Sequence, residues 1–356
     1  YDSTAEKTFT NNAFSHFVTD TMTILWEPAD SGCRLLRCFG NSPILNVPDM
    51  IDGRTVSEMG AYCFSRSRPR FPEKIYKTIF IDIENQESGQ AFNQKDFDFS
   101  AFGTELDGTF LEEITLPDCA TTLHNAAFYN CRKLKKLSVG TAISGIGSDE
   151  FMNDSQLEHL IIRGKDSEAT GLPLILERIA ENITVSFCPN SSSSPESIVF
   201  FPEYYEWLDE ISPAHIFSRS IHGEGFRMRK SFENGILNYR KYDSCLENAL
   251  TVESPESLCK IALNRLRWPS RLEDIFREKY ENVIKKYMGT AFTLAVKDQD
   301  FPMLQFICEH FSPDASALAS AIDQCIEKEW GEGNAFLIEA KHKSFSKKTF
   351  DFDLDF

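Results

Sequence analysis

The sequence predicts an α+β fold in which a short β-solenoid of stacked repeats is followed by a separate, mostly α-helical domain. The first observation is a period of 23 residues: the stretches 111–133 and 134–156 carry apolar residues at the same offsets, and a third start follows at Leu157. Self-similarity at a fixed period of this size is typical of stacked repeats. The second observation is a change from strand-like repeats to helical apolar stripes across "CPNSSSSPES", residues 188–197.

Each repeat is expected to contribute a short strand and a turn to a shared core. In "LEEITL", Ile114 and Leu116 alternate with Thr115, so the two apolar side chains point inward and the threonine points outward. Phe128 then returns the chain to the core, and Phe151 holds the matching place one period later. Chance spacing in an α/β domain is the alternative, but it does not account for three starts in register.

The stretch "LEEITLPDCATTLHNAAFYNCRKL" resembles the BspA-type leucine-rich repeat, a bacterial variant of the same period. Upstream, "NVPDMIDGRTVSEMGAYCFS" (46–65) resembles the unit with which such repeats begin, and "YKTIFI" (76–81) is expected to be the next strand. The resemblance implies a leucine-rich-repeat solenoid over residues 41–188. It also implies protein or peptide binding, because many BspA-type proteins are surface or secreted adhesion proteins of bacteria.

Three segments around the repeats depart from the pattern. Residues 1–40 are predicted to form a strand-rich N-terminal cap, and residues 82–110 to form an irregular insertion in the solenoid. After Ile162 the repeat degenerates, and a helix followed by a strand is expected to close the open end. Exposed ends of repeat arrays need such caps.

The second half of the chain is predicted to be helical. Residues 189–197 have the Pro/Ser-rich composition of an exposed linker, and residues 198–356 are expected to form a helical-hairpin domain. Apolar stripes with helix start and stop signals predict helices over 254–269 and 272–288. The Asn-Gly pair in "SFENGIL" (231–237) predicts a β-hairpin before them.

Residues 290–310 resemble an ankyrin helix pair at Leu294, Ala295 and Leu304, whereas Ala291 and Gln299 depart from the ankyrin pattern. The next predicted pair begins too soon for the ankyrin period of about 33 residues. The expectation is therefore a helical-hairpin array that is only weakly ankyrin-like. The final "FDFDLDF" alternates strictly, which is typical of a strand that docks on a sheet edge, in this chain or in a partner.

Composition narrows the possible partners. The chain has 54 acidic and 37 basic residues and a net charge of −17, so it repels phosphate backbones and no nucleic acid partner is expected. No apolar run reaches the roughly 18 residues that span a bilayer, so no membrane insertion is expected. The ten cysteines occur singly. Unpaired cysteines and the lack of a visible signal favour a cytoplasmic location, whereas the family resemblance favours a secreted or cell-surface one.

No catalytic, cofactor-binding or metal-binding residue is predicted. The seven histidines show no metal-ligand pairing and no hydrolase motif, and "HGEGF" (222–226) lacks the third glycine of a phosphate-binding loop. The basic and aromatic residues of "RMRKSFENGILNYRKY" are better explained as a solvated hairpin than as a nucleic-acid site. We therefore predict a non-catalytic interaction module. The alternative is an enzyme, a hydrolase or a nucleotide-binding protein, with its site at the interdomain cleft.

The outward face of the solenoid strands is the predicted binding surface, because repeat proteins commonly bind through such faces. A solvated strand face without a ligand is the competing interpretation. Ile161 argues against it, since solubility alone does not explain an outward isoleucine. The candidate residues, two from each repeat, are Glu113, Thr115, Lys136, Ser138, His159 and Ile161.

Overall fold

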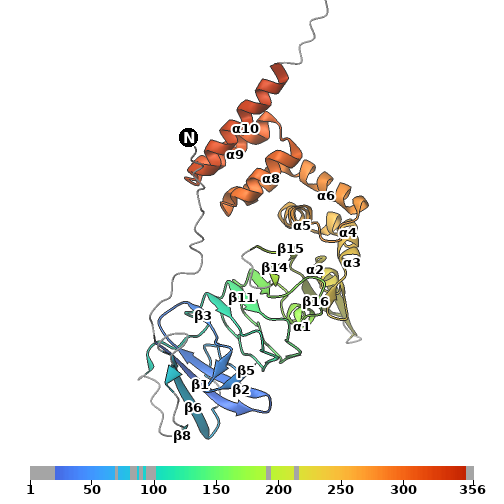
Figure 1. Ribbon diagram of the computed structural model, residues 1–356. Helices are drawn as coiled ribbons and strands as arrows, with labels where there is room; N and C mark the ends of the chain where they lie inside the picture. The colour runs from blue at the N-terminus through green and yellow to red at the C-terminus, as the bar shows by residue number, and fades with distance from the viewer. Residues whose placement is uncertain are drawn as a thin grey trace, which may run out of the picture. The chain divides into compact units, whose positions relative to one another are not determined.

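The computed structural model describes residues 21–68, 71–80, 86–87, 91–93, 102–189, 194–211 and 216–349 (Figure 1). A β-solenoid of about six turns spans residues 33–187, and a C-terminal region of helices follows it, so the predicted α+β fold is confirmed. The chain divides into two compact units. The first contains residues 1–134 and 146–154, and the second contains residues 135–145 and 155–356.

An antiparallel hairpin begins the described part of the first compact unit. Strand β1 (Met22–Ala29) pairs with β2 (Gly32–Phe39) on one side and with β6 (Lys74–Phe80) on the other, antiparallel in both cases. The segment expected as the next repeat strand is thus part of this N-terminal sheet and not a rung of the solenoid. Trp26 explains its position, because its ring stacks on Tyr76 at 4.7 Å and its Nε1 donates to the Thr78 hydroxyl at 3.0 Å.

The remaining strands of the first compact unit are short. Strand β2 pairs parallel with β5, and β5 pairs parallel with β10, which begins one wall of the solenoid. In the other wall, β3 pairs parallel with β9. Their bounds, with those of the edge strands, are β3 (Ile44–Asn46), β4 (Met50–Ile51), β5 (Arg54–Met59), β7 (Gln86–Glu87), β8 (Ala91–Asn93), β9 (Glu113–Thr115) and β10 (Thr122–Leu123). A further strand, β12, covers Gly145–Ile146.

A stack of phenylalanine rings runs through the core of the first compact unit. The ring centroids of Phe64 and Phe128 lie 5.0 Å apart, and those of Phe128 and Phe151 lie 5.2 Å apart. All three side chains are buried. The correspondence of Phe128 and Phe151 predicted from the 23-residue period is therefore confirmed, since each ring occupies the same place in its repeat.

Polar groups repeat with the same period at the turns. Asn153 Nδ2 donates to Asn130 Oδ1 at 2.9 Å, and Asp154 Oδ1 accepts from the Cys131 backbone N–H at 2.7 Å. In both pairs the partners are 23 residues apart. Asn130 and Asn153 have positive φ angles of 60° and 69°, a conformation that asparagine tolerates better than most residues. The turns therefore specify the register of neighbouring repeats by hydrogen bonding as well as by packing.

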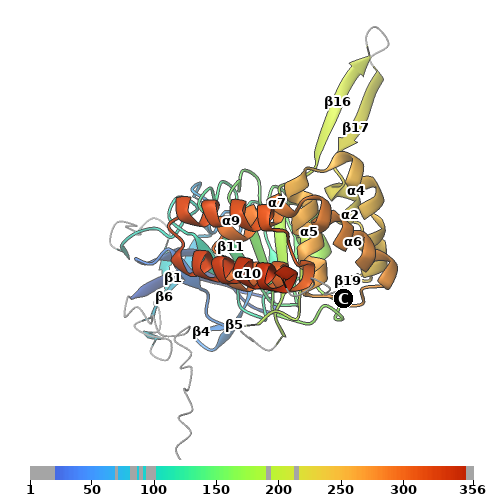
Figure 2. The ribbon, with the colours of Figure 1, turned by 90° about the horizontal axis from the view of Figure 1, so that it is seen from above.

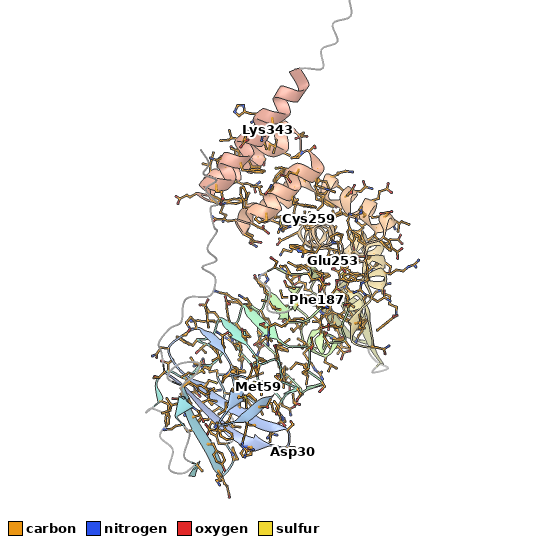
Figure 3. All side chains as sticks on the ribbon, viewed as in Figure 1. Asp30, Met59, Phe187, Glu253, Cys259 and Lys343 are labelled. Atoms are coloured by element: carbon orange, nitrogen blue, oxygen red, sulfur yellow. The ribbon has the colours of Figure 1, made fainter. Side chains whose placement is uncertain are left out.

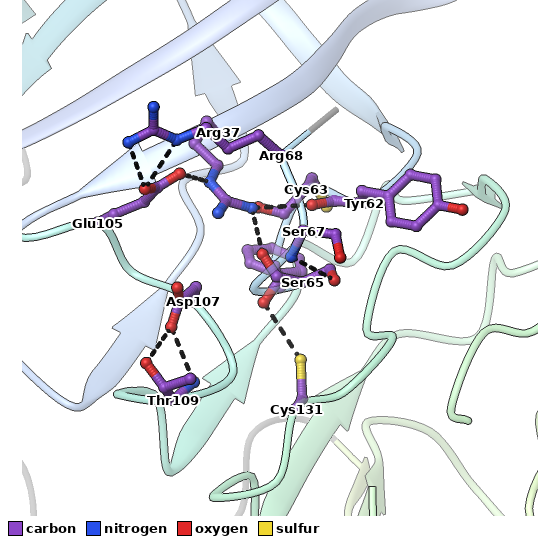
Figure 4. Close-up of polar contacts among 11 residues, drawn as sticks. Arg37, Tyr62, Cys63, Ser65, Ser67, Arg68, Glu105, Asp107, Thr109 and Cys131 are labelled. Atoms are coloured by element: carbon purple, nitrogen blue, oxygen red, sulfur yellow. Dashed lines mark hydrogen bonds and ion pairs between the residues drawn. The ribbon is translucent and has the colours of Figure 1, made fainter. Parts of the chain in front are cut away.

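A fully buried arginine holds the turn that leads to Phe64 (Figure 4). Arg37 Nη1 donates to the backbone carbonyls of Tyr62 at 2.9 Å and Ser65 at 2.6 Å, and its Nε pairs with Glu105. The Glu105 carboxylate also contacts the exposed Arg68 at 3.3 Å. A buried guanidinium is tolerated only when it is paired and hydrogen-bonded. Arg37 thus makes this turn dependent on a carboxylate 68 residues away in the chain.

The second compact unit continues the parallel strands. Strand β11 (Lys136–Val139) pairs with β13 (His159–Ile162), β13 pairs with β14 (Ile183–Phe187), and β15 (Ser197–Phe201) adds antiparallel to β14. Helix α1 (Leu172–Leu176) and β14 follow β13, as the helix and strand expected after Ile162. The division at a 189–197 linker stays a prediction: β15 begins at Ser197, and residues 190–193 lie outside the described residues.

Helices form most of the rest of the second compact unit (Figures 1 and 2). Their bounds are α2 (Gly225–Met228), α3 (Tyr239–Ser244), α4 (Leu246–Val252), α5 (Pro255–Arg267), α6 (Asp274–Lys286), α7 (Met288–Lys297), α8 (Phe301–Phe311), α9 (Ala315–Glu327) and α10 (Gly331–Thr349). Helices α5 and α6 confirm the two predicted from the apolar stripes, and β18 (Phe232–Glu233) with β19 (Ile236–Leu237) confirms the Asn-Gly hairpin. The ankyrin likeness of α7 and α8 is not confirmed. The "FDFDLDF" tail lies outside the described residues.

A second hairpin was not expected from the sequence. Strand β16 (Tyr205–Ile211) pairs antiparallel with β17 (Ile216–His222), and within the described part of the chain these strands pair only with each other. Figure 2 shows the two strands extending away from helices α2 and α4.

A buried polar network joins the helices to the last strands within the second compact unit. Arg265 donates from Nε and Nη2 to the two Asp243 carboxylate oxygens at 2.8 and 2.9 Å, and the Tyr280 hydroxyl donates to Asp243 Oδ1 at 2.8 Å. The Tyr239 hydroxyl reaches Asp166, in the loop after β13, at 2.8 Å. These contacts hold α3, α5 and α6 together and tie α3 to the loop after β13.

Candidate functional site

The outward residues of the parallel strands form two rows in the second compact unit. One row contains Lys136, His159, Thr184 and Phe200, which are register partners across β11, β13, β14 and β15. The other row contains Ser138, Ile161, Ser186 and Ile198. We call these eight residues the strand face.

The residues between the two rows point the other way. Leu137, Leu160, Val185 and Val199 are register partners in the same four strands, and each has an exposed fraction of 0%. Period-2 alternation in a half-buried strand requires this arrangement. The inward and outward positions therefore follow the alternation expected from the sequence.

The four candidate residues on β11 and β13 differ in accessibility. His159 is exposed, whereas Lys136 and Ile161 are half-buried. Ser138 is buried, and its hydroxyl accepts a hydrogen bond from Arg163 Nη1 at 2.7 Å. Register places Lys136 beside His159 and Ser138 beside Ile161. Lys136, His159 and Ile161 are therefore the side chains that a ligand can reach, while Ser138 is engaged within the chain.

The other two candidates lie in the first compact unit. Glu113 and Thr115 are half-buried in β9, where they face Ile44 and Asn46 of β3 as register partners. Ile44 has an exposed fraction of 51%, which makes it a second outward isoleucine that the sequence analysis missed. The signal was present, because "Leu45-Asn46-Val47-Pro48" matches the "Ile114-Thr115-Leu116-Pro117" of the complete repeat.

Helix α5 borders the strand face. The sequence did not indicate this contact. Phe200 is buried, and Lys260 of α5 places its Nζ 5.3 Å from the centroid of the Phe200 ring. Helix α5 therefore covers the β15 end of the strand face. The accessible part of the face runs from β14 to β11.

Charged groups near α5 and α7 affect the pKa of His159. Burial among surrounding protein atoms lowers the pKa of His159, although its side chain is exposed. The carboxylates of Glu158 and Asp298 act to raise that pKa, while the ammonium groups of Lys136 and Lys260 act to lower it. Asp298 follows the last turn of α7. His159 thus sits on a surface that is open to solvent and is flanked by charged groups from α5 and α7.

A histidine–carboxylate pair in the first compact unit is the best candidate for catalysis outside this face. His124 Nε2 lies 2.7 Å from Glu58 Oε2, and Arg34 also contacts that oxygen at 2.7 Å. Burial acts to raise the pKa of Glu58, but the hydrogen bonds from His124 and Arg34 lower it overall. Arg34 and Glu58 are register partners in β2 and β5, so this is a cross-strand charge pairing. The hydrogen bonds described for His124 include no hydroxyl or thiol nucleophile.

The described residues contain no group of three or more His, Cys, Asp or Glu side chains placed to hold a metal ion. All ten cysteines are free thiols, and burial raises the pKa of Cys63 and Cys131 well above the usual thiol value. Among the described helices, none is long and apolar enough to cross a membrane.

Residues 97–170 match the family model of the BspA type leucine rich repeat region (6 copies). This range includes the three repeat starts at Leu111, Leu134 and Leu157. The repeats are similar to BspA-type leucine-rich repeats. The resemblance inferred from the 23-residue period is therefore confirmed over these residues. No curated protein and no solved structure matches the chain.

Proposed function

We propose that the chain is a non-catalytic module that binds a protein or a peptide on the strand face, at Lys136, His159 and Ile161. Glu113 and Thr115, on β9 of the first compact unit, are separate candidates for the same kind of contact. The similarity to leucine-rich repeats supports a protein-interaction role at the level of the family. The observation that carries the proposal is the half-buried Ile161, which lies on an outward row next to the exposed His159 row.

The chemistry of this surface suits a polypeptide ligand. Ile161 offers apolar area, Lys136 offers a cation, and the lowered pKa of His159 favours a neutral imidazole that both donates and accepts hydrogen bonds. Interaction surfaces typically combine an apolar centre with polar groups at the rim. A solvated face has no need of the apolar component.

The biological purpose of this binding is also a proposal. Bacterial adhesion or interaction with a host protein is the role that the BspA-type resemblance favours, by analogy alone. The alternative, a hydrolase or nucleotide-binding enzyme, is supported by none of the polar clusters among the described residues.

Affinity capture tests the proposal. The immobilised chain is compared with a Lys136→Glu/Ile161→Thr variant, using bacterial and host extracts, and captured proteins are identified by mass spectrometry. Threonine keeps the β-branched shape that suits a strand. We expect a specific protein to be captured by the native chain and lost with the variant.

A matched control separates the strand face from general effects of charge and stability. Lys133→Glu/Ile146→Thr makes the same chemical changes at an exposed lysine and at the half-buried Ile146 of β12. This control should retain capture. Capture that survives in a well-folded strand-face variant would rule out the strand face as the binding surface.

A further inference from the structure

The projecting hairpin formed by β16 and β17 has features that its own stability does not require. Its two strands pair residue by residue from Tyr205↔His222 to Ile211↔Ile216, and no third strand joins them in the described part of the chain. Two-stranded hairpins are only marginally stable alone, and open strand edges are templates for pairing with another chain. Tyr205 and Leu208 nonetheless have exposed fractions of 58% and 66%.

A groove of about 530 Å³ lies where this hairpin meets α4 and the start of α5. Its apolar lining comes from Tyr205 and Ile221 of the hairpin and from Val252 at the end of α4. The exposed fractions of Ile221 and Val252 are 38% and 52%. Tyr205 is held in place by stacking on His222, with ring centroids 4.8 Å apart. The apolar wall is therefore preformed and open to solvent. We call this site the hairpin groove.

The polar lining of the hairpin groove combines two carboxylates with the neutral polar side chains of Asn248, Ser254 and Ser257 and with His222. Glu203 and Glu253 line it, and Figure 3 labels Glu253 between α4 and α5. Glu253 accepts the backbone N–H of Glu224 at 2.6 Å, which fixes its carboxylate. Burial raises the pKa of Glu253, and the nearby carboxylates of Glu224 and Glu203 act to raise it further, whereas the Glu224 N–H and the Arg229 guanidinium act to lower it. A cation placed between these carboxylates would relieve that repulsion.

We propose that the hairpin groove binds an extended, basic and apolar segment of a partner protein. A lysine or arginine of that segment lies between Glu203 and Glu253, and its apolar neighbours pack on Tyr205, Ile221 and Val252. Arginine and lysine stems cover apolar surface while their charged heads reach carboxylates, so one such side chain satisfies both parts of the groove. This surface is separate from the strand face and does not depend on the function proposed for it.

Charge favours this occupant over two others. The tail of this chain, "FDFDLDF", contributes three aspartates and would be repelled by Glu203 and Glu253. A second copy of the chain brings a further net charge of −17. Like charges placed together oppose association, whereas complementary charges favour it.

A fluorescein-labelled peptide of alternating lysine and valine is the probe, titrated into the full chain and followed by fluorescence anisotropy. We expect saturable binding that Glu203→Gln/Glu253→Gln weakens by about tenfold or more, because a charged partner is lost at a partly desolvated site. The Glu327→Gln/Glu332→Gln variant loses the same net charge from exposed positions in α9 and α10 and should bind as the native chain does. An alternating glutamate and valine peptide should not bind.

Five outcomes would overturn the proposal. If both double variants weakened peptide binding equally, the loss of net charge alone would explain the effect. If a folded Tyr205→Ser variant bound the peptide unchanged, the apolar wall would not be part of the binding site. Loss of peptide binding in Lys136→Glu/Ile161→Thr would place the probe on the strand face. A dimer in sedimentation velocity that Tyr205→Ser dissociates, or tighter peptide binding after truncation beyond Thr349, would make a second copy or the tail the occupant.

Discussion

The Tyr239 hydroxyl donates to Asp166 Oδ2 across 2.8 Å and thereby ties helix α3 to the loop that follows solenoid strand β13. The same hydroxyl lies 2.8 Å from Ser197 Oγ at the start of β15. The side chains of Tyr239 and Asp166 are both buried. Arg271 also reaches Asp166 Oδ1 at 3.0 Å. Sequence-distant elements of the second compact unit are thus joined at one carboxylate.

Tyr239→Phe is expected to lower the free energy of unfolding by about 1–3 kcal/mol, because it leaves a buried carboxylate oxygen without its hydroxyl donor. Urea denaturation followed by circular dichroism measures the change. Tyr287→Phe is the control: Tyr287 is half-buried, and its substitution should stay within about 0.5 kcal/mol. Equal effects of the two substitutions would mean that the hydroxyl of Tyr239 is not what matters.

Asp166 should make stability depend on acid pH. Burial acts to raise its pKa, but the hydrogen bonds from Ser270 and Tyr239 and the Arg271 guanidinium lower it below the usual value of 3.8. A carboxyl with a lowered folded-state pKa contributes stability above its unfolded pKa and loses it as pH falls through the folded value. The stability gap between the native chain and Asp166→Asn should therefore narrow below about pH 4. A gap that widens on acidification would contradict this sign.

Arg37→Met should destabilise the first compact unit by about 3–5 kcal/mol, since it leaves Glu105 and the carbonyls of Tyr62 and Ser65 without their buried donor. Arg68→Met is the matched control, because Arg68 contacts the same Glu105 carboxylate but has a side chain that is 56% exposed. Its loss should cost less than about 1 kcal/mol. Thermal unfolding of both variants provides the comparison.

Leu137→Ala should cost about 2–5 kcal/mol, because it opens a cavity at a position with an exposed fraction of 0%. Leu174→Ala removes the same atoms from α1 at a position that is 38% exposed, and it should cost less than about 1 kcal/mol. Chemical denaturation distinguishes the two. A mild Leu137→Ala would place the wrong row of strand residues in the core.

Limited proteolysis tests the predicted linker at residues 189–197. We expect the first cleavage in the Ser191–Ser194 run, because Pro/Ser-rich segments between packed elements are preferred sites of nicking. Mass spectrometry of the fragments identifies the cut. Early cleavage between residues 111 and 160 with the serine run intact would contradict the predicted division.

The periodic part of the fold could be predicted from sequence because each repeat buries similar apolar residues at the same offsets. Phe128 and Phe151 stack because one residue type recurs at one offset, and Leu137 is buried because strand side chains alternate. Such local rules are visible in a single chain. The inward residues of β11 and β13 and the helices α5 and α6 followed from these rules.

What the sequence did not indicate depends on contacts between distant segments. Lys260 reaches the Phe200 ring because α5 packs over β15, and no local period encodes that meeting. Hairpin β16–β17 was missed because Tyr205 and Leu208 expose apolar side chains on opposite faces, so the segment lacks the polar and apolar alternation of a half-buried strand. Ser138 was a candidate by position alone, and only the structure shows its bond to Arg163.

The hydrogen bonds from Asn153 to Asn130 and from Cys131 to Asp154 also restrict how this solenoid can change in length. Removing or duplicating one complete repeat leaves every turn facing an equivalent turn. Inserting a single residue within a repeat separates both pairs at once and moves Phe151 away from Phe128. The solenoid is therefore expected to gain or lose length in steps of one repeat, with smaller insertions confined to segments outside the repeat ladders.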